Sequence, residues 1–131
     1  MTKGYQKENT SVHLLNYHFV WCPRYRRKLF VRELKERLIH LIKEKVNFIE
    51  CKILRLEVMP DHVHLFIHSN PKLSPNNMIG QIKGITSKIL REEFPALRKM
   101  PTLWTRSYFV STAGNVSSFV IQKYIDEQYS K

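Results

Sequence analysis

The sequence predicts a single α+β domain in which helices cover one face of an antiparallel sheet. Three observations lead to this fold class. The 131 residues are enough for one domain with an apolar core and too few for two. Apolar residues change along the chain between the spacing typical of strands and that of helices. The predicted order is strand, helix, strand, strand, helix, strand, helix, so residues 1–131 should form one domain, with residues 1–10 flexible.

The first half of the chain predicts a strand, a helix and a hairpin. Residues 11–21 (SVHLLNYHFVW) are rich in aromatic and apolar side chains, as strands are. Apolar residues then recur at helical spacing over 31–49, with charged residues between them. Two further segments, separated by a Pro-Asp turn, predict strands that pair with each other: 51–59 and 62–68.

The second half predicts another helix, a strand and a short final helix. Ser74 is a good N-cap, and the helix after it should run to about Glu93, because Pro95 disfavours helix at the residue before it. Residues 102–110 (TLWTRSYFV) predict a fourth strand, and apolar residues in 116–125 predict the C-terminal helix. Four antiparallel strands with two helices on one face make a ferredoxin-like (RRM-like) sandwich, to which the last helix is an addition.

Positive charge is the strongest signal in the composition. The chain has 22 Lys and Arg against 11 Asp and Glu, a net charge of +11. A charge-rich thermophilic surface would raise acids and bases together, so it does not explain this imbalance. A polyanionic partner does, and nucleic acid is favoured over an anionic membrane surface.

The remaining composition indicates a cytoplasmic protein without a membrane partner. No apolar run has the length of a membrane span, and the first residues lack the apolar segment of a signal peptide. The two cysteines, Cys22 and Cys51, form no C-x-x-C pair. A structural disulfide or a cysteine zinc site is therefore not expected.

Two histidines lie inside an apolar run, in the segment EVMPDHVHLFIH at 57–68. His62 and His64 should point to the same face of the strand, where neighbouring imidazoles make half of a divalent metal site. The alternative is a pair of structural histidines, which is the commoner case for an isolated H-x-H pattern. His68 has the same parity but lies about 13 Å along the strand from His64, too far to share a metal. The other histidines are expected to form no comparable cluster: His13, His18 and His40.

Other enzyme classes with paired histidines fit less well. A histidine-triad hydrolase would need a third histidine where Phe66 stands. Two-motif phosphoesterases need H-x-T or H-x-S twice, and a zinc protease needs H-E-x-x-H on a helix. None of these patterns is present, so a third ligand must come from elsewhere in the chain.

The C-terminal helix offers that ligand and a nucleophile. Tyr124 and Gln128 are one helical turn apart and share a face. The amide oxygen of Gln128 is a hard ligand that suits Mg²⁺ or Mn²⁺, and the phenol of Tyr124 can attack a polarised phosphate. Taken alone, a core tyrosine and a solvated glutamine are the commoner explanations. Tyr129 points about 140° away from Tyr124 on an ideal helix, so it is a poorer candidate nucleophile.

Three motifs in this order carry a family resemblance: P-D-H-V-H-L, W-x-x-x-Y-F at 104–109 and Y-I-x-x-Q at 124–128. Together they resemble the single-tyrosine transposases with a His-hydrophobic-His (HUH) motif that belong to IS200/IS605-type insertion sequences. The resemblance extends from about His13 to Gln128. Ser107 departs mildly from it, because a smaller residue, often glycine, is expected before the Tyr-Phe pair.

The resemblance implies a site and a reaction. His62, His64 and Gln128 would hold Mg²⁺ or Mn²⁺, and Tyr124 would be the nucleophile. Such enzymes cleave and rejoin single-stranded DNA near hairpins at element ends, through a 5′-phosphotyrosine and without ATP. They act as homodimers whose active sites are shared between subunits, in the cytoplasm of prokaryotes and associated with the nucleoid. Gly114 would be a hinge before the tyrosine helix, although a simple turn explains it equally well.

Basic residues with an interleaved aromatic side chain predict the DNA surface. The predicted contacts are Arg24, Tyr25, Arg26, Arg27, Lys28, Lys83, Lys88, Arg91 and Arg106. Two alternative functions stay open. One is a domesticated HUH nuclease that processes repeated hairpins, and the other is a non-catalytic nucleic-acid-binding module of the same fold.

Overall fold

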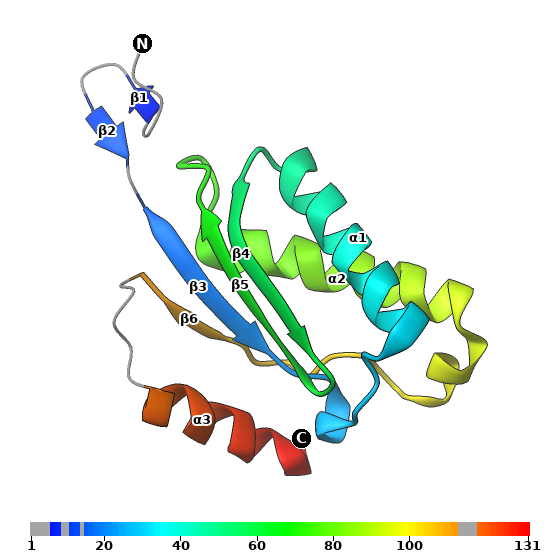
Figure 1. Cartoon of the computed structure of the whole chain (residues 1–131). Helices are drawn as coiled ribbons and strands as arrows, with labels where there is room; N and C mark the ends of the chain where they lie inside the picture. The colour runs from blue at the N-terminus through cyan, green and yellow to red at the C-terminus, as the bar shows by residue number, and fades with distance from the viewer. Residues whose placement is uncertain (1–5, 9–10, 14, 113–117) are drawn as a thin grey trace.

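Four strands form the main sheet of the protein in a computed structural model, which describes residues 6–8, 11–13, 15–112 and 118–131 (Figure 1). The strands are β3 (Asn16–Trp21), β4 (Lys52–Met59), β5 (His62–His68) and β6 (Phe109–Ser111). They lie in the order β4-β5-β3-β6, and every neighbouring pair is antiparallel. With one helix in each crossover, this is the ferredoxin-like arrangement, so the predicted fold class is confirmed.

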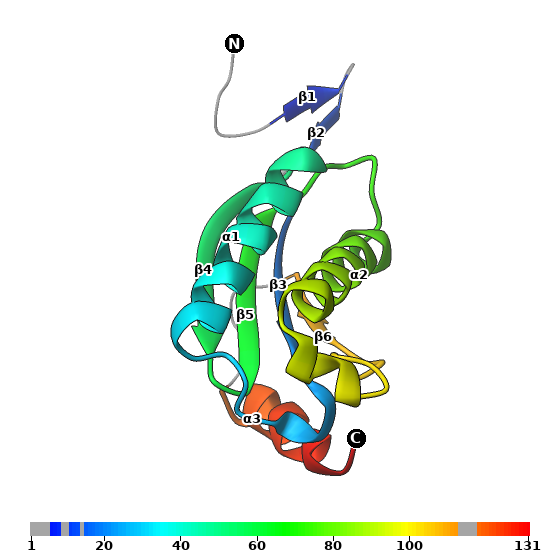
Figure 2. The same ribbon diagram turned by 90° about the vertical axis from the view of Figure 1, so that its right-hand side faces the viewer.

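Two long helices pack together against one face of this sheet: α1 (Arg32–Phe48) and α2 (Pro75–Glu93) (Figures 1 and 2). The main core lies between them and alternate strand residues, among which Val63, Leu65 and Ile67 of β5 are fully buried. The predicted N-cap of α2 is confirmed, because the Ser74 hydroxyl accepts a hydrogen bond from the Asn77 amide at 3.0 Å. The same alternation turns His62 and His64 toward the opposite face.

The C-terminal helix α3 (Ser118–Asp126) lies at the end of the sheet that carries the β4–β5 turn, and a 3₁₀ turn, η3 (Glu127–Ser130), follows it (Figures 1 and 2). Ile125 packs there in a second apolar cluster with Val20 and Cys22 of the β3 segment. Val20 alternates with Phe19 and Trp21 of the main core, so α3 covers part of the face that α1 and α2 leave open.

The remaining elements are short, and some differ from the predictions. The predicted strand 11–21 is divided into β2 (Ser11–His13) and β3, and β2 pairs with an unpredicted strand, β1 (Gln6–Glu8). Two 3₁₀ turns complete the list: η1 (Arg24–Arg26) and η2 (Pro95–Lys99). None of the helices in the described ranges is long and apolar enough to cross a membrane.

The predicted strand 102–110 is wrong over most of its length. Only Phe109 and Val110 of that segment belong to β6, while Trp104 forms an isolated bridge with Pro23. Lys83 gives a physical reason for the short strand. Its ammonium group donates hydrogen bonds to the carbonyl oxygens of Thr105 and Ser107 at 2.8 and 2.9 Å. These carbonyls therefore bond to a side chain instead of a neighbouring strand.

Candidate metal and nucleophile site

The two histidines of the H-x-H motif lie close together on the open face of the sheet. His62 and His64 have ring centroids 4.9 Å apart, with the ring planes nearly perpendicular. Each ring uses its Nδ1 atom for a contact with the protein. His62 Nδ1 lies 2.8 Å from Asp61 Oδ1, and His64 Nδ1 lies 3.1 Å from His18 Nε2.

His18 is a member of this cluster that the sequence did not reveal. The expectation that it forms no comparable cluster is wrong, since its ring stacks on His64 with centroids 5.3 Å apart. The antiparallel register places Val20 opposite His64 and His18 opposite Phe66. His18 thus lies diagonally across from His64 on the same face. Only the register of β3 on β5 decides this, and no sequence spacing gives it.

The pKa values of His64 and His18 are both lowered, which favours neutral imidazole rings in the cluster. The pKa of His64 is lowered to about 4, first by burial and then by the neighbouring rings of His62 and His18. Burial also lowers the pKa of His18. Both rings are therefore neutral at pH 7, the form in which an imidazole nitrogen binds a metal.

The donor set fits a divalent ion that takes its third ligand from another residue type. Within the described ranges, the Nε2 atoms of His62 and His64 have no hydrogen-bond partner, so no protein group occupies either atom. The same ranges hold no group of three His, Cys, Asp or Glu able to bind a metal. Gln128, as an amide ligand, is the kind of residue that would complete the set.

Arg26 connects the histidine turn to the C-terminal helix. Its Nε lies 2.7 Å from Asp61 Oδ2, its Nη1 lies 3.1 Å from Asp126 Oδ1, and its guanidinium carbon stands 4.0 Å from the centroid of the Tyr129 ring. Burial alone would raise the pKa of Asp61, but the hydrogen bonds from Arg26 and His62 outweigh it and hold that pKa below its usual range. Asp61 is therefore a carboxylate at neutral pH.

Tyr124 and Gln128 meet at a single hydroxyl group, that of Ser107. Tyr124 Oη lies 3.0 Å from Ser107 Oγ, and Ser107 Oγ donates to Gln128 Oε1 at 3.2 Å. The Gln128 amide nitrogen donates in turn to the Tyr124 carbonyl at 3.1 Å. The predicted shared face is thus confirmed. Among the described residues, neither side chain has a hydrogen bond to His62 or His64, so Gln128 as a metal ligand stays a prediction.

Burial around this second group changes two pKa values. It raises the pKa of Tyr124 to about 12, although the hydrogen bonds to Ser107 and Thr105 act in the opposite direction. It also lowers the pKa of Lys83 to about 8. The phenol is therefore fully protonated at neutral pH.

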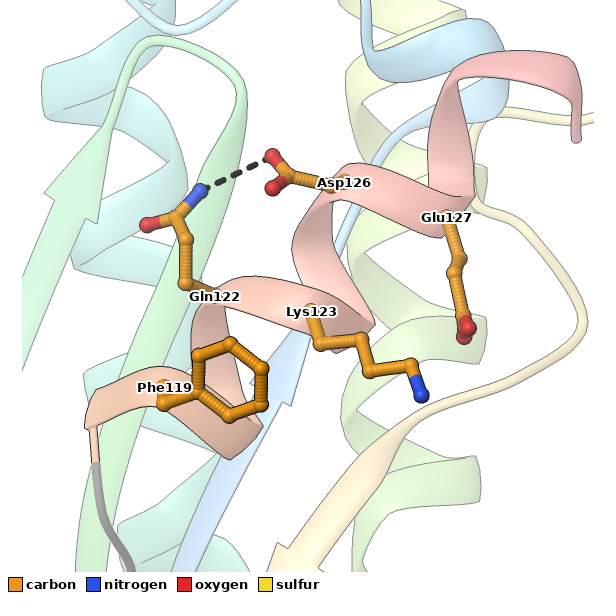
Figure 3. A pocket seen from close by; sticks show the side chains of 5 residues that line it. All are labelled: Phe119, Gln122, Lys123, Asp126 and Glu127. Carbon is orange, nitrogen blue, oxygen red and sulfur yellow. Dashed lines mark hydrogen bonds between the residues drawn. The ribbon is translucent and has the colours of Figure 1, made fainter.

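The opposite side of the helix is exposed and carries no predicted catalytic residue. Figure 3 shows a shallow pocket on this side, in which Gln122 donates a hydrogen bond to Asp126 at 2.9 Å. Five residues line it: Phe119, Gln122, Lys123, Asp126 and Glu127. Gly114, the predicted hinge, lies outside the described residues.

The structure divides the predicted DNA contacts into two groups. Three of them bind protein acceptors: Arg26 holds two carboxylates, Lys83 two carbonyls, and Arg91 the carbonyls of Met100 and Pro101. For these three the structure indicates a role within the fold, since a bound cation is less available to phosphate. The exposed contacts are Tyr25, Arg27, Lys28, Lys88 and Arg106, of which Lys88 pairs with Glu92. Arg24 belongs to neither group, because it is half-buried and its Nε has no hydrogen-bond partner among the described residues.

Tyr25 keeps the interleaved arrangement that the sequence suggests. It is 46% exposed, and the guanidinium groups of Arg24 and Arg27 stand 5.3 and 5.9 Å from its ring centroid. Its φ of 57° is in the left-handed region, which a non-glycine residue adopts only under strain. The turn η1 thus presents an aromatic ring between two cations.

Known proteins share both the sequence and the fold. The family model for IS200-like transposases matches residues 11–128. The ISDra2 transposase TnpA of Deinococcus radiodurans is 30% identical over 129 residues, which cover 96% of this chain and 92% of that protein. The transposase for insertion sequence element IS200 of Salmonella typhimurium is 32% identical over 115 residues, 86% of this chain and 75% of that protein.

Solved structures agree. A crystal structure of a Deinococcus radiodurans protein described as a transposase has a TM-score of 0.88 and 30% identity, and covers 96% of this chain and 99% of that one. A REP-associated tyrosine transposase bound to a REP hairpin has a TM-score of 0.57 and 15% identity, and covers 95% and 70%. That second match shows a shared fold. On the family match and the similarity to the Deinococcus and Salmonella proteins, the chain belongs to the IS200-like transposases.

Proposed function

We propose that this transposase cleaves and rejoins single-stranded DNA at the ends of an insertion sequence, with Tyr124 as the nucleophile. His62, His64 and Gln128 would hold the Mg²⁺ or Mn²⁺ ion. One observation carries the proposal: two histidines on the open face of β5 have free Nε2 atoms, and Arg26 connects their turn to the helix that carries Tyr124. The protein would act on DNA in the cytoplasm of a prokaryotic cell.

The proposed reaction exchanges one ester bond for another. The Tyr124 phenol oxygen attacks the scissile phosphorus and loses its proton to solvent. The bond from phosphorus to the 3′ oxygen breaks, and that oxygen leaves as a hydroxyl group after taking up a proton. The number of phosphate ester bonds is unchanged, so rejoining needs no ATP. A bound divalent ion would supply neutralisation of the charge that builds on the phosphate oxygens.

For that attack, the Tyr124 phenol and the Gln128 amide have to reach the histidines of the H-x-H motif. The phenol and the Gln128 amide are both hydrogen-bonded to Ser107, and we propose that both exchange this contact for one with the phosphate and the metal ion at the histidines. A movement of α3 within one chain would meet this requirement. A homodimer in which α3 of one subunit serves the histidines of the other would meet it too, and we propose this shared arrangement.

The DNA partner we propose is a single strand with a hairpin. The exposed ring of Tyr25 between two guanidinium groups suits an unpaired base, and the neighbouring cations suit phosphates. A transposase of the same fold has been solved with a REP hairpin, which supports a hairpin as the kind of DNA that this fold accommodates.

A covalent adduct is the decisive test of this function. Labelled single-stranded hairpin DNA is incubated with the protein and Mg²⁺, and adducts are separated on a denaturing gel. The protein should form an adduct, Tyr124→Phe should form none, and the matched control Tyr129→Phe should behave as the unchanged protein. His62→Ala should abolish cleavage and retain DNA binding. DNA binding with no adduct under any metal condition would instead indicate a non-catalytic binding module.

A further inference from the structure

The two histidines of the H-x-H motif differ from free imidazoles in that each has its Nδ1 atom engaged. An imidazole can bind a metal through either nitrogen, and the partner of one nitrogen decides which of them is left. We infer that Asp61 and His18 are positioning residues that fix His62 and His64 so that both present Nε2 to the divalent ion. This inference rests on the proposed function, because that function gives the pair a metal to bind.

Asp61 determines which nitrogen of His62 carries the proton. A carboxylate only accepts hydrogen bonds, so the 2.8 Å contact requires a proton on His62 Nδ1. The lone pair of His62 is then on Nε2. Asp61 is only 7% exposed, and Arg26 Nε holds its other oxygen at 2.7 Å. The carboxylate therefore has little freedom to turn away from the ring.

His18 performs the same task for His64 through a second ring. Its Nε2 lies 3.1 Å from His64 Nδ1, and one of the two nitrogens must donate to the other. If His64 Nδ1 donates, the lone pair of His64 is on Nε2 and can bind a metal. The opposite choice leaves no proton on His64 Nδ1, so the proton of the neutral ring is on Nε2. Metal binding selects the first arrangement.

The position of His18 makes it a rigid acceptor. It is 8% exposed and stacks on Phe66 with ring centroids 3.9 Å apart and planes 13° from parallel. Phe109 also lies edge-on to the His18 ring, with centroids 6.4 Å apart. A buried ring packed against two phenyl rings cannot rotate freely, so its contact with His64 Nδ1 fixes the orientation of His64 as well as its tautomer.

Two substitutions of similar size separate this role from simple packing. His18→Leu fills the space without an acceptor, whereas His18→Gln keeps an amide oxygen for the His64 N–H. We expect Mn²⁺ affinity, measured by calorimetry without DNA, to fall about 10- to 100-fold in His18→Leu and to be largely retained in His18→Gln. Asp61→Ala should weaken Mn²⁺ binding by a similar factor, and Asp61→Asn by less.

His68 provides a matched control. It is on the same strand and the same face, and its Nδ1 makes a comparable contact of 2.9 Å with Asn16 Oδ1. His68→Ala should leave Mn²⁺ affinity unchanged. Nitrogen-15 NMR gives a second readout, because His64 should lose its Nδ1–H signature in His18→Leu and keep it in His18→Gln.

The outcomes separate the inference from the proposed function. If the protein binds Mn²⁺ and His18→Leu binds it equally well, the positioning role is wrong while the transposase mechanism stands. The same conclusion follows if His68→Ala weakens binding as much as His18→Leu. If the protein neither binds Mn²⁺ nor forms the tyrosine adduct, the proposed function fails and the inference fails with it.

Discussion

The strand half and the helix half of the candidate site are held in place by different kinds of contact. His62 and His64 are on a strand with neighbours on both sides, and a buried carboxylate and a stacked ring hold their Nδ1 atoms. Tyr124 is on the C-terminal helix α3 and Gln128 is on the 3₁₀ turn η3 after it. Both share the hydroxyl group of Ser107, and Tyr124 also packs against the apolar cluster of Val20, Cys22 and Ile125. The difference indicates that the strand half is preformed in the sheet, whereas the helix half is held by apolar packing and one shared hydroxyl group.

The largest expected effect comes from the preformed half. His64→Ala should reduce adduct formation about 100- to 1,000-fold, because it removes a ligand that helps to stabilise charge in the transition state. Hairpin DNA affinity, measured by fluorescence anisotropy, should change less than about twofold. His68→Ala is the control and should retain activity. An active His64→Ala variant would show that the strand half does not carry the metal.

Arg26 tests the connection between the two halves. Arg26→Met should lower the free energy of unfolding by about 2–3 kcal/mol, because it leaves the buried Asp61 carboxylate without its cation. Urea denaturation measures this loss, and Arg27→Met, at an exposed position, should cost less than about 0.5 kcal/mol. If Arg26→Met kept full stability and lost DNA affinity instead, Arg26 would be a DNA contact, as the sequence alone suggested.

Lys83 tests how firmly the segment that carries Ser107 is held. Its pKa is lowered from 10.5 to about 8 in the folded protein, so between these values the unfolded chain binds more protons and stability rises with pH. Below pH 8 Lys83 is charged in both states, so the full cost of burying its ammonium group lowers the free energy of unfolding. Relative to Lys83→Met, the protein should gain at most about 1.4 kcal/mol per pH unit above pH 8. A difference between the two that does not change with pH would contradict this burial.

The smallest expected effect is at Ser107 itself. Ser107→Ala removes the shared hydroxyl group, so the phenol and the amide are released more easily, and adduct formation should be about three- to fivefold faster. Ser107→Thr retains a hydroxyl group and should stay close to the unchanged protein in single-turnover measurements. A slower Ser107→Ala variant would mean that this contact positions Tyr124 for attack instead of restraining it.

The sequence predicts the fold well where local patterns decide the structure. Alternation in 62–68, helical spacing in 31–49 and the cap at Ser74 are all local signals, and all are confirmed. Local patterns did not predict that β6 would begin only at Phe109 instead of near residue 102. Lys83 looks like a surface cation in the sequence, and only the packing of α2 on the 105–107 segment shows that it binds carbonyl groups.

The sequence proposes residues for the candidate site but does not identify most of their hydrogen-bond partners. His62, His64, Tyr124 and Gln128 came from spacing and family resemblance, but His18 depends on the register of two strands. Arg26 appeared as a DNA contact because it lies in a basic loop. Its acceptor Asp126 is 100 positions away in the sequence, so no local pattern could connect them. Ser107 appeared only as a departure from the family, and its two hydrogen bonds are tertiary contacts.

The pairing of Arg26 with two carboxylates has an electrostatic consequence. The chain has a net charge of +11, which attracts DNA and repels cations. Around Arg26, one positive charge faces Asp61 and Asp126, so this group carries one net negative charge beside the histidines. A divalent cation would find a local minimum of potential there, and an arriving phosphate would deepen it. We therefore expect this group to favour a divalent cation at the histidines although the overall charge of the molecule repels cations.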